Sequence, residues 1–259
     1  MLSPFFAPSA QRGSFWLALS APVAGIAALF MLAGTAQARC ADLALVLAID
    51  ASGSINADEF ALQKQGYVHA FRSPRVQSAL AAAGKVDVGI ILWGDSEMAL
   101  QVLPLARLQS AGDAEALSRR IEALPRRVFG NTGIGRAVSK AIDLLDAPDE
   151  CASRRIINLS GDGLETIAPR PRQHVPLALA RNRAEASGIT INALAIETDV
   201  ADLGNWFRDR LITGPGAFVL AVDSFETFGL AIEKKLAREI RPEALSLLQA
   251  DNRVAPHPD

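Results

Sequence analysis

Three oxygen-bearing side chains, Asp50, Ser52 and Ser54, alternate with small residues directly after an apolar segment. That segment, residues 43–49, is seven apolar residues long and shows no polar alternation, which is typical of a strand buried on both faces of a sheet. In open α/β sheets, ligands bind outside the carboxyl ends of such strands. Because hard divalent cations such as Mg2+ prefer oxygen ligands, the three side chains form a candidate cation site.

Two later residues could complete this site. Thr132 lies in the Gly- and Asn-containing segment 130–135, and Asp162 follows a second apolar strand, predicted over residues 154–159. Any one of these side chains could equally cap a helix or tighten a turn, as Ser, Thr and Asp often do. All five in order, each after a predicted strand or turn, favour a metal site.

An Asp-x-Ser-x-Ser stretch after a buried strand, followed by a distant Thr and a later Asp, resembles the metal-ion-dependent adhesion site (MIDAS) of von Willebrand factor A domains. The resemblance implies Mg2+, or Mn2+ or Ca2+ in its place, bound directly by Ser52, Ser54 and Thr132. Asp50 and Asp162 would act partly through water. It also implies an unknown protein partner that offers an acidic side chain to the ion.

A second resemblance covers most of the chain. From about residue 40 to residue 240 it is similar to a proteobacterial family of secreted A-domain-like proteins with no assigned function. The segments that carry this similarity are residues 160–163, 190–196 and 214–219. Glu165 departs from the amide residues that this family tends to have near the site.

The beginning of the chain is expected to direct export. No charge occurs between Gly13 and Ala38, residues 15–34 are rich in Ala, Leu, Ile and Phe, and residues 36–38 have the small-x-small pattern of signal peptidase sites. We therefore predict a signal peptide over residues 1–38 and a periplasmic or secreted protein. An uncleaved anchor stays open, because about 20 apolar residues can span a bilayer. No later segment is long and apolar enough to form a stable membrane span.

The charge of the chain excludes one class of partner. Half of the 259 residues are apolar, and the formal charge of −2 would become −3 on loss of Arg12 with the signal peptide. This balance gives no electrostatic basis for binding nucleic acid. The short basic pairs Arg126-Arg127 and Arg154-Arg155 are expected to be solvated charges in a loop and at the entry to a strand.

The two cysteines are predicted to form a disulfide. Cys40 precedes Asp50 by ten residues, and Cys151 precedes Asp162 by eleven. If both aspartates end neighbouring parallel strands, both cysteines lie near the opposite ends of those strands, about 4.8 Å apart. An oxidising compartment would permit the bond. Two free thiols are the alternative.

Apolar segments alternate with helix-like segments through the rest of the chain. This order predicts an α/β fold with a doubly wound, mostly parallel sheet and helices on both faces. We expect one von Willebrand factor A-like domain over residues 39–240, followed by a tail over residues 241–259. Residues 99–103 are expected to form an edge strand that ends at Pro104.

We expect a binding module and not an enzyme. The chain has no phosphate-binding loop, and Ser160 lacks the Gly-x-Ser-x-Gly context of a hydrolase nucleophile. A hydrolytic triad that uses Ser160 and His174 is an alternative. A periplasmic metal-dependent hydrolase would need a general base beside the metal, for which only Glu165 or Asp95 is available.

The resulting hypothesis is an exported, adhesion-type module that binds a protein partner through a divalent metal. The loops after Trp93, around Phe129 and over residues 163–176 are expected to frame the contact surface. A structural envelope protein with an idle metal site is the third alternative.

Overall fold

The computed structural model describes residues 40–241. The predicted signal peptide, residues 1–38, and the predicted tail beyond Arg241 lie outside the described residues. Within them, no helix has both the length and the apolar character needed to cross a membrane.

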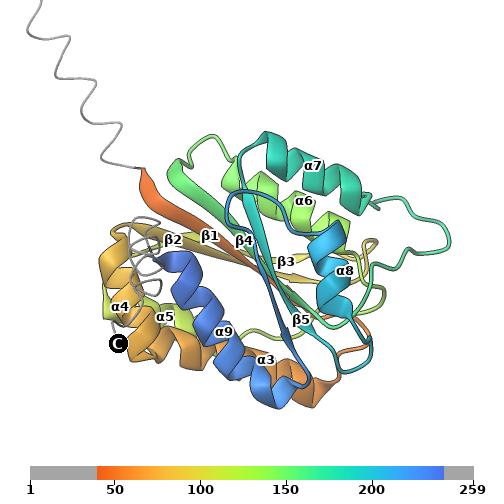
Figure 1. Ribbon diagram of the computed structural model, residues 1–259, viewed down its shortest axis with the longest axis horizontal. Coiled ribbons are helices and arrows are strands. Elements are labelled where there is room, and N and C mark those ends of the chain that lie inside the picture. The colour runs from red at the N-terminus through yellow and green to blue at the C-terminus, as the bar shows by residue number, and fades with distance from the viewer. Residues whose placement is uncertain (1–39, 242–259) are drawn as a thin grey trace, which may run out of the picture. The chain divides into compact units, whose positions relative to one another are not determined.

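The described chain contains six strands and seven helices (Figure 1). The strands are β1 (Ala41–Asp50), β2 (Val86–Trp93), β3 (Gln101–Leu108), β4 (Ala152–Gly161), β5 (Thr190–Ile196) and β6 (Val219–Val222). The helices are α3 (Ala57–Arg72), α4 (Pro74–Ala83), α5 (Ala111–Glu122), α6 (Ile134–Leu145), α7 (Leu177–Ala186), α8 (Leu203–Arg210) and α9 (Phe225–Ile240).

The strands form one sheet in the order β3-β2-β1-β4-β5-β6. All neighbouring pairs are parallel except β2 and β3, which are antiparallel. The strand order reverses between β1 and β4, since the chain runs outward from β1 on one side and from β4 on the other. The predicted doubly wound, mostly parallel α/β fold is therefore confirmed, and its topological switch point lies between the two strands that lead into Asp50 and Asp162.

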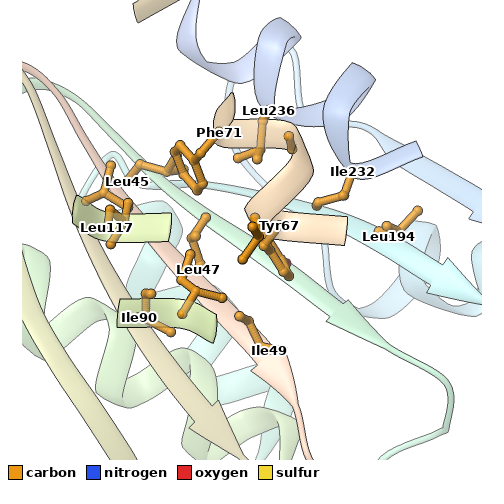
Figure 2. Packing of buried hydrophobic residues seen from close by; sticks show 14 of the residues in the cluster. Leu45, Leu47, Ile49, Tyr67, Phe71, Ile90, Leu117, Leu194, Ile232 and Leu236 are labelled. Atoms are coloured by element: carbon orange, nitrogen blue, oxygen red, sulfur yellow. The ribbon is translucent and has the colours of Figure 1, made fainter. Parts of the chain in front are cut away.

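Helices cover both faces of the sheet (Figure 1). Alternate residues of β1 point to opposite faces, as in any strand. Leu45, Leu47 and Ile49 pack against the layer that contains α3, α5 and α9, where Tyr67 and Phe71 of α3 are fully buried (Figure 2). The smaller residues between them face the layer of α6, α7 and α8. Burial on both faces explains the unbroken apolar character of β1.

The edge strand differs from its prediction. Pro104 does not end the strand, because β3 continues to Leu108. The pairing of β2 and β3 shifts register between Val88 and Ile90, opposite this part of β3. Pro104 is exposed, and an edge strand with a register irregularity can accept a proline that donates no hydrogen bond.

The start of α3 is fixed by local chemistry that the sequence shows directly. The side chain of Asn56 accepts hydrogen bonds from the backbone N–H groups of Asp58 and Glu59, and the side chain of Glu59 accepts one from the N–H of Asn56. This capping box directs the chain away from Ser54 into the helix that covers β1.

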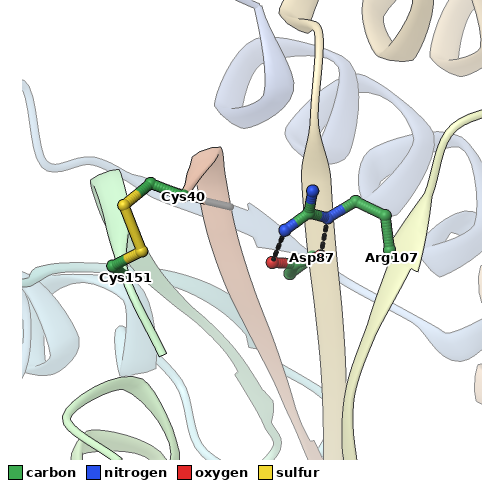
Figure 3. Close-up of a disulfide and its surroundings, with 4 residues drawn as sticks. All are labelled: Cys40, Asp87, Arg107 and Cys151. Carbon is green, nitrogen blue, oxygen red and sulfur yellow. Dashed lines mark hydrogen bonds and ion pairs between the residues drawn. A yellow bond between two sulfur atoms is a disulfide. The ribbon is translucent and has the colours of Figure 1, made fainter. Parts of the chain in front are cut away.

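The predicted disulfide between Cys40 and Cys151 is present (Figure 3). It joins the segments that enter β1 and β4, with the two Cα atoms 4.7 Å apart. In the same view, Arg107 of β3 pairs with the buried carboxylate of Asp87 on β2, and one of its two bonds, from Nη2 to Oδ2, is 2.9 Å long. A disulfide and an ion pair therefore connect neighbouring strands at the end of the sheet opposite Asp50.

Candidate metal centre

Asp50 and Asp162 lie beside each other at the switch point of the sheet. Asp50 is the last residue of β1, Asp162 follows the last residue of β4, and Ile49 is paired with Ser160 across the two strands. Both residues are buried, with exposed fractions of 0% for Asp50 and 1% for Asp162. Two acidic groups are therefore held together where water has little access.

A chain of hydrogen bonds connects the first motif to Asp162. The backbone N–H of Ser52 donates to Oδ1 of Asp50 over 2.7 Å. The hydroxyl oxygens of Ser52 and Ser54 are 3.3 Å apart, and Ser54 Oγ donates to Oδ1 of Asp162 over 2.7 Å. Four of the five predicted side chains are thus in one connected group.

Thr132 approaches the same group from the loop before α6. It is nearly buried, and a Cβ atom placed on Gly163 would lie 3.6 Å from its Oγ1 atom. The backbone of Thr132 is held by Thr166, whose Oγ1 accepts from the Thr132 N–H over 2.8 Å and whose N–H donates to the Thr132 carbonyl over 3.0 Å. The hydroxyl of Thr132 therefore lies beside the residue that follows Asp162.

A positive charge would stabilise the two buried carboxylates of this cluster. Burial, followed by the nearby charge of Asp162, raises the pKa of Asp50 to about 8. Burial also raises the pKa of Asp162. The Oδ2 atoms of both carboxylates are buried and have no hydrogen-bond partner within residues 40–241. Since leaving a buried acceptor unpaired costs about 1–3 kcal/mol, these oxygens are suited to an ion, and the donor set fits a hard divalent cation.

No three His, Cys, Asp or Glu side chains of the described residues cluster closely enough to hold a metal by themselves. A cation at this place would therefore depend on the hydroxyl groups as well as on Asp50 and Asp162. Hydroxyl and carboxylate oxygens are both acceptable ligands for Mg2+, which keeps several waters in most protein sites.

Gly161 is required by the close approach of β4 to β1. A Cβ atom at this position would lie 2.9 Å from Oδ2 of Asp50 and 3.3 Å from the ring of Trp93. A side chain here would push directly on the carboxylate of Asp50. The lack of a side chain at Gly161 therefore leaves room for Oδ2 of Asp50.

Two residues that the sequence analysis did not connect to the site hold the motif in place. Arg126 was expected to be solvated, but its guanidinium donates to the carbonyl of Ala51 at 3.1 and 3.2 Å and to that of Ser52. Gln63 of α3 is buried, and its Nε2 donates to the carbonyl of Asp50 over 3.1 Å. These acceptors are backbone groups far away in sequence, so no motif could have indicated the contacts.

The two candidate general bases have other partners. Oε1 of Glu165 accepts from the N–H of Gly135 over 2.9 Å, at the start of α6. A carboxylate there is favourable, because the helix N-terminus carries partial positive charge. Oδ2 of Asp95 accepts from Nδ2 of Asn131 over 3.0 Å, and its Oδ1 accepts from the N–H of Glu97 over 2.8 Å. Both acidic residues therefore support the loops around Thr132.

Ser160 lies in the interior of the fold. Its side chain is fully buried, and its Oγ is 3.3 Å from the hydroxyl of Tyr67 of α3. His174 belongs to the loop between β4 and α7, and no hydrogen bond joins it to Ser160 among the described residues. The geometry gives Ser160 a buried position and a hydrogen-bonding partner on α3.

Comparisons with known proteins agree with this architecture. A family model described as "Protein of unknown function (DUF1194)" matches residues 39–244. No curated protein matches the chain.

Solved structures share the fold at low sequence identity. The pilus adhesin SpaC of Lactobacillus rhamnosus GG has a TM-score of 0.57 and 15% identity, over 77% of this chain and 30% of the adhesin. Proximal thread matrix protein 1 of the mussel byssus, with a zinc-occupied MIDAS motif, has a TM-score of 0.55 and 17% identity, over 76% of this chain and 48% of that protein.

The von Willebrand factor domain of the type V pilus tip protein Mfa5 from Porphyromonas gingivalis has a TM-score of 0.53 and 12% identity, over 78% of this chain and 97% of that domain. This chain therefore has the von Willebrand factor A fold. It spans less than half the length of the adhesin and of the byssus protein.

Proposed function

The chain belongs to the DUF1194 family, whose description assigns no activity, and on that premise we propose that it is an exported, adhesion-type module that binds a protein partner through Mg2+ or a similar divalent cation. The observation that carries the proposal is the pair of buried, unpaired carboxylate oxygens of Asp50 and Asp162 beside hydroxyl groups. Of the three solved structures named above, one has a zinc-occupied MIDAS motif and two are pilus proteins.

Each residue of the cluster has a distinct part in this proposal. Ser52, Ser54 and Thr132 would bind the cation directly, while Asp50 and Asp162 would orient them and balance the charge. The ion, when bound, would supply positive charge and an open coordination position. A carboxylate of the partner is the favoured ligand there, because a negatively charged oxygen would replace a water molecule on the cation.

The loops around the cluster offer a contact surface with apolar character. Phe129 precedes the Thr132 loop and is 56% exposed, while Leu164 and Ile167 flank Thr166 and are 39% and 53% exposed. These are three of the five large hydrophobic side chains exposed in residues 40–241. Exposed apolar patches often mark protein interaction sites, and Phe is enriched in interfaces, so the partner is expected to present apolar groups beside its carboxylate.

Binding is favoured over catalysis because Asp95 and Glu165 are engaged by backbone N–H groups or an amide. A metal-dependent hydrolase would need one of them free to activate water. We propose a periplasmic or extracellular location, which agrees with the predicted signal peptide and with a disulfide that an oxidising compartment permits.

The proposal can be tested by recovering the partner from envelope extracts of the source organism. Tagged protein should retain a specific partner in Mg2+ and release it with a chelator, and the Asp50→Ala variant should retain none. Asp58→Ala, which removes an exposed carboxylate on α3, is the matched control and should behave like the parent. Retention by Asp50→Ala, or retention in the chelator, would contradict metal-mediated binding.

A further inference from the structure

A second candidate site lies at the opposite end of the sheet from Asp50. A cavity of about 980 Å3 opens where β4 and β5 begin and α9 ends. Because Arg154 and Asp162 are separated by eight residues of extended chain, the cavity is roughly 26 Å from the metal centre. Its size is within the range of small-molecule sites. The two sites are therefore separate.

The lining of this cavity is strongly basic. Six cationic residues contribute to it, and Glu239 is the one acidic residue among the residues described there. The cationic residues are Arg75, Arg154, Arg155, Lys234, Arg238 and Arg241.

Both carboxylate oxygens of Glu239 accept hydrogen bonds from buried side chains. Its Oε1 accepts from Lys235 over 2.6 Å and from Nδ2 of Asn192 over 3.0 Å, and its Oε2 accepts from Nδ2 of Asn158 over 2.6 Å. Glu239 and Lys235 are both buried. Glu239 therefore neutralises Lys235 and not the cations of the lining. Among these cations, Arg75 pairs with Glu233 and Arg155 with Asp146, neither of which lines the cavity.

Two of the lining cations are side chains of α9. Lys234 and Arg238 are exposed and lie four residues apart on α9, so they share one face of the helix. The guanidinium of Arg238 stacks on the ring of Phe218, 3.7 Å from its centre. Stacking leaves the N–H groups of the guanidinium free at its edge, and within residues 40–241 neither these groups nor the Lys234 ammonium meet a hydrogen-bond acceptor.

Phe218, on whose ring Arg238 stacks, is itself held in place. The N–H of Phe218 donates to Oδ1 of Asn192 over 3.0 Å, and Asn192 is buried and bonded to Glu239. The buried polar group thus orients the aromatic ring, and the ring orients the guanidinium. A planar, pre-oriented guanidinium can bind two oxygens of a carboxylate or phosphate at once.

We propose that this cavity binds a small anion with two or more phosphate or carboxylate groups, with Lys234 and Arg238 as its main ligands. The stacked guanidinium holds one anionic group and the ammonium of Lys234 holds a second. The ring of Phe218 and the side chain of Pro215, which also lines the cavity, accept the body of the ligand. Binding here is independent of the metal centre.

Calorimetric titration of the full chain with tripolyphosphate and with citrate, in metal-free buffer, tests the proposal. Either anion should bind, and the stronger of the two shows whether phosphate or carboxylate is preferred. In the double variant Lys234→Gln/Arg238→Gln, the dissociation constant should rise about tenfold or more, because two charge-assisted hydrogen bonds are lost.

Two controls make the result decisive. Arg120→Gln/Arg210→Gln removes two exposed cations outside the cavity and should bind both anions like the parent. Asp50→Ala should also bind like the parent. The proposal is overturned if the parent binds neither anion, if both double variants lose affinity equally, or if Asp50→Ala abolishes binding. Urea unfolding of each variant shows whether a loss reflects misfolding.

Discussion

Ser54 donates a 2.7 Å hydrogen bond to Oδ1 of Asp162, a residue 108 positions later in the chain. The serine belongs to the loop after β1 and the aspartate to the loop after β4, so the bond joins the two sides of the switch point. Ser54 is exposed whereas Asp162 is buried. The pair therefore marks the position where solvent, or a ligand from solvent, reaches the buried carboxylates.

Replacement of Ser54 tests this pair. Ser54→Ala removes one hydrogen bond to a charged group, and we expect the free energy of unfolding without metal to fall by about 1–2 kcal/mol. Affinity for Mg2+ should fall by about tenfold or more, as for other lost partners of a metal site. Urea unfolding and calorimetry would measure both. Ser78→Ala, an exposed serine on α4, is the control and should change neither; unchanged Mg2+ affinity in Ser54→Ala would contradict a ligand role.

The raised pKa of Asp50, about 8 in the folded protein, predicts a pH dependence of stability. The unfolded chain has an Asp pKa near 3.9, so between about pH 4 and about pH 8 the folded protein holds the proton more tightly. The tighter proton binding by folded Asp50 therefore adds to the free energy of unfolding of the metal-free protein at low pH. This stabilisation is lost as the pH rises through about 8.

The comparison of parent and Asp50→Asn isolates this effect. The variant keeps an oxygen for the Ser52 N–H but cannot ionise, so the part of the pH slope that comes from Asp50 should vanish. Urea unfolding at pH 5 and pH 8 gives the difference. In the parent, Mg2+ affinity should rise over the same range because binding requires the ionised carboxylate. Equal slopes in the two proteins would show that Asp50 does not titrate in this range.

The contact of Gly161 with Asp50 predicts a steric effect. Gly161→Ala places a methyl group 2.9 Å from Oδ2 of Asp50, and we expect a loss of about 1–3 kcal/mol in the free energy of unfolding, as for other overpacked sites. Gly112→Ala on α5 is the control, since its new Cβ would meet only Ser110 Oγ at 3.5 Å. This change should stabilise the helix by about 0.5–1 kcal/mol. A stable Gly161→Ala protein would mean that β4 can move away from Asp50.

Removal of the disulfide tests the connection between β1 and β4. The bond between Cys40 and Cys151 spans 111 residues, and the chain-entropy model gives it about 4–5 kcal/mol for a loop of this length. Cys40→Ser/Cys151→Ser should lower the unfolding free energy by that order, and the parent in reductant should match it. Less than about 1 kcal/mol in both cases would show that the unfolded chain gains little freedom from cleavage.

Much of the fold could be predicted because burial leaves a direct signal in the sequence. The apolar run of β1 reflects contact with helices on both faces, and the spacing of Cys40 and Cys151 before the two aspartates reflects strands of equal length. The prediction that the edge strand ends at Pro104 was wrong. Proline has no N–H group to donate, and an edge strand with shifted register does not need that hydrogen bond.

The supporting contacts of the site could not be predicted. Arg126 and Gln63 donate to backbone carbonyls, which every residue has, so their partners leave no trace in the sequence. Arg154 and Arg155 were expected to be solvated but line the basic cavity, since the order of the strands brings their end of β4 beside α9. Such roles depend on which distant elements meet, and the local pattern of residues does not show this. The metal-ligand roles of the five residues stay a prediction.

The most direct measurement is the structure of crystals grown with Mn2+, using its anomalous scattering. The account predicts one strong peak bonded to the hydroxyl oxygens of Ser52, Ser54 and Thr132, with Asp50 and Asp162 beside it, and no peak in Asp50→Ala. The absence of any peak in the parent, or a peak that Thr132 and Asp162 cannot reach, would contradict the account.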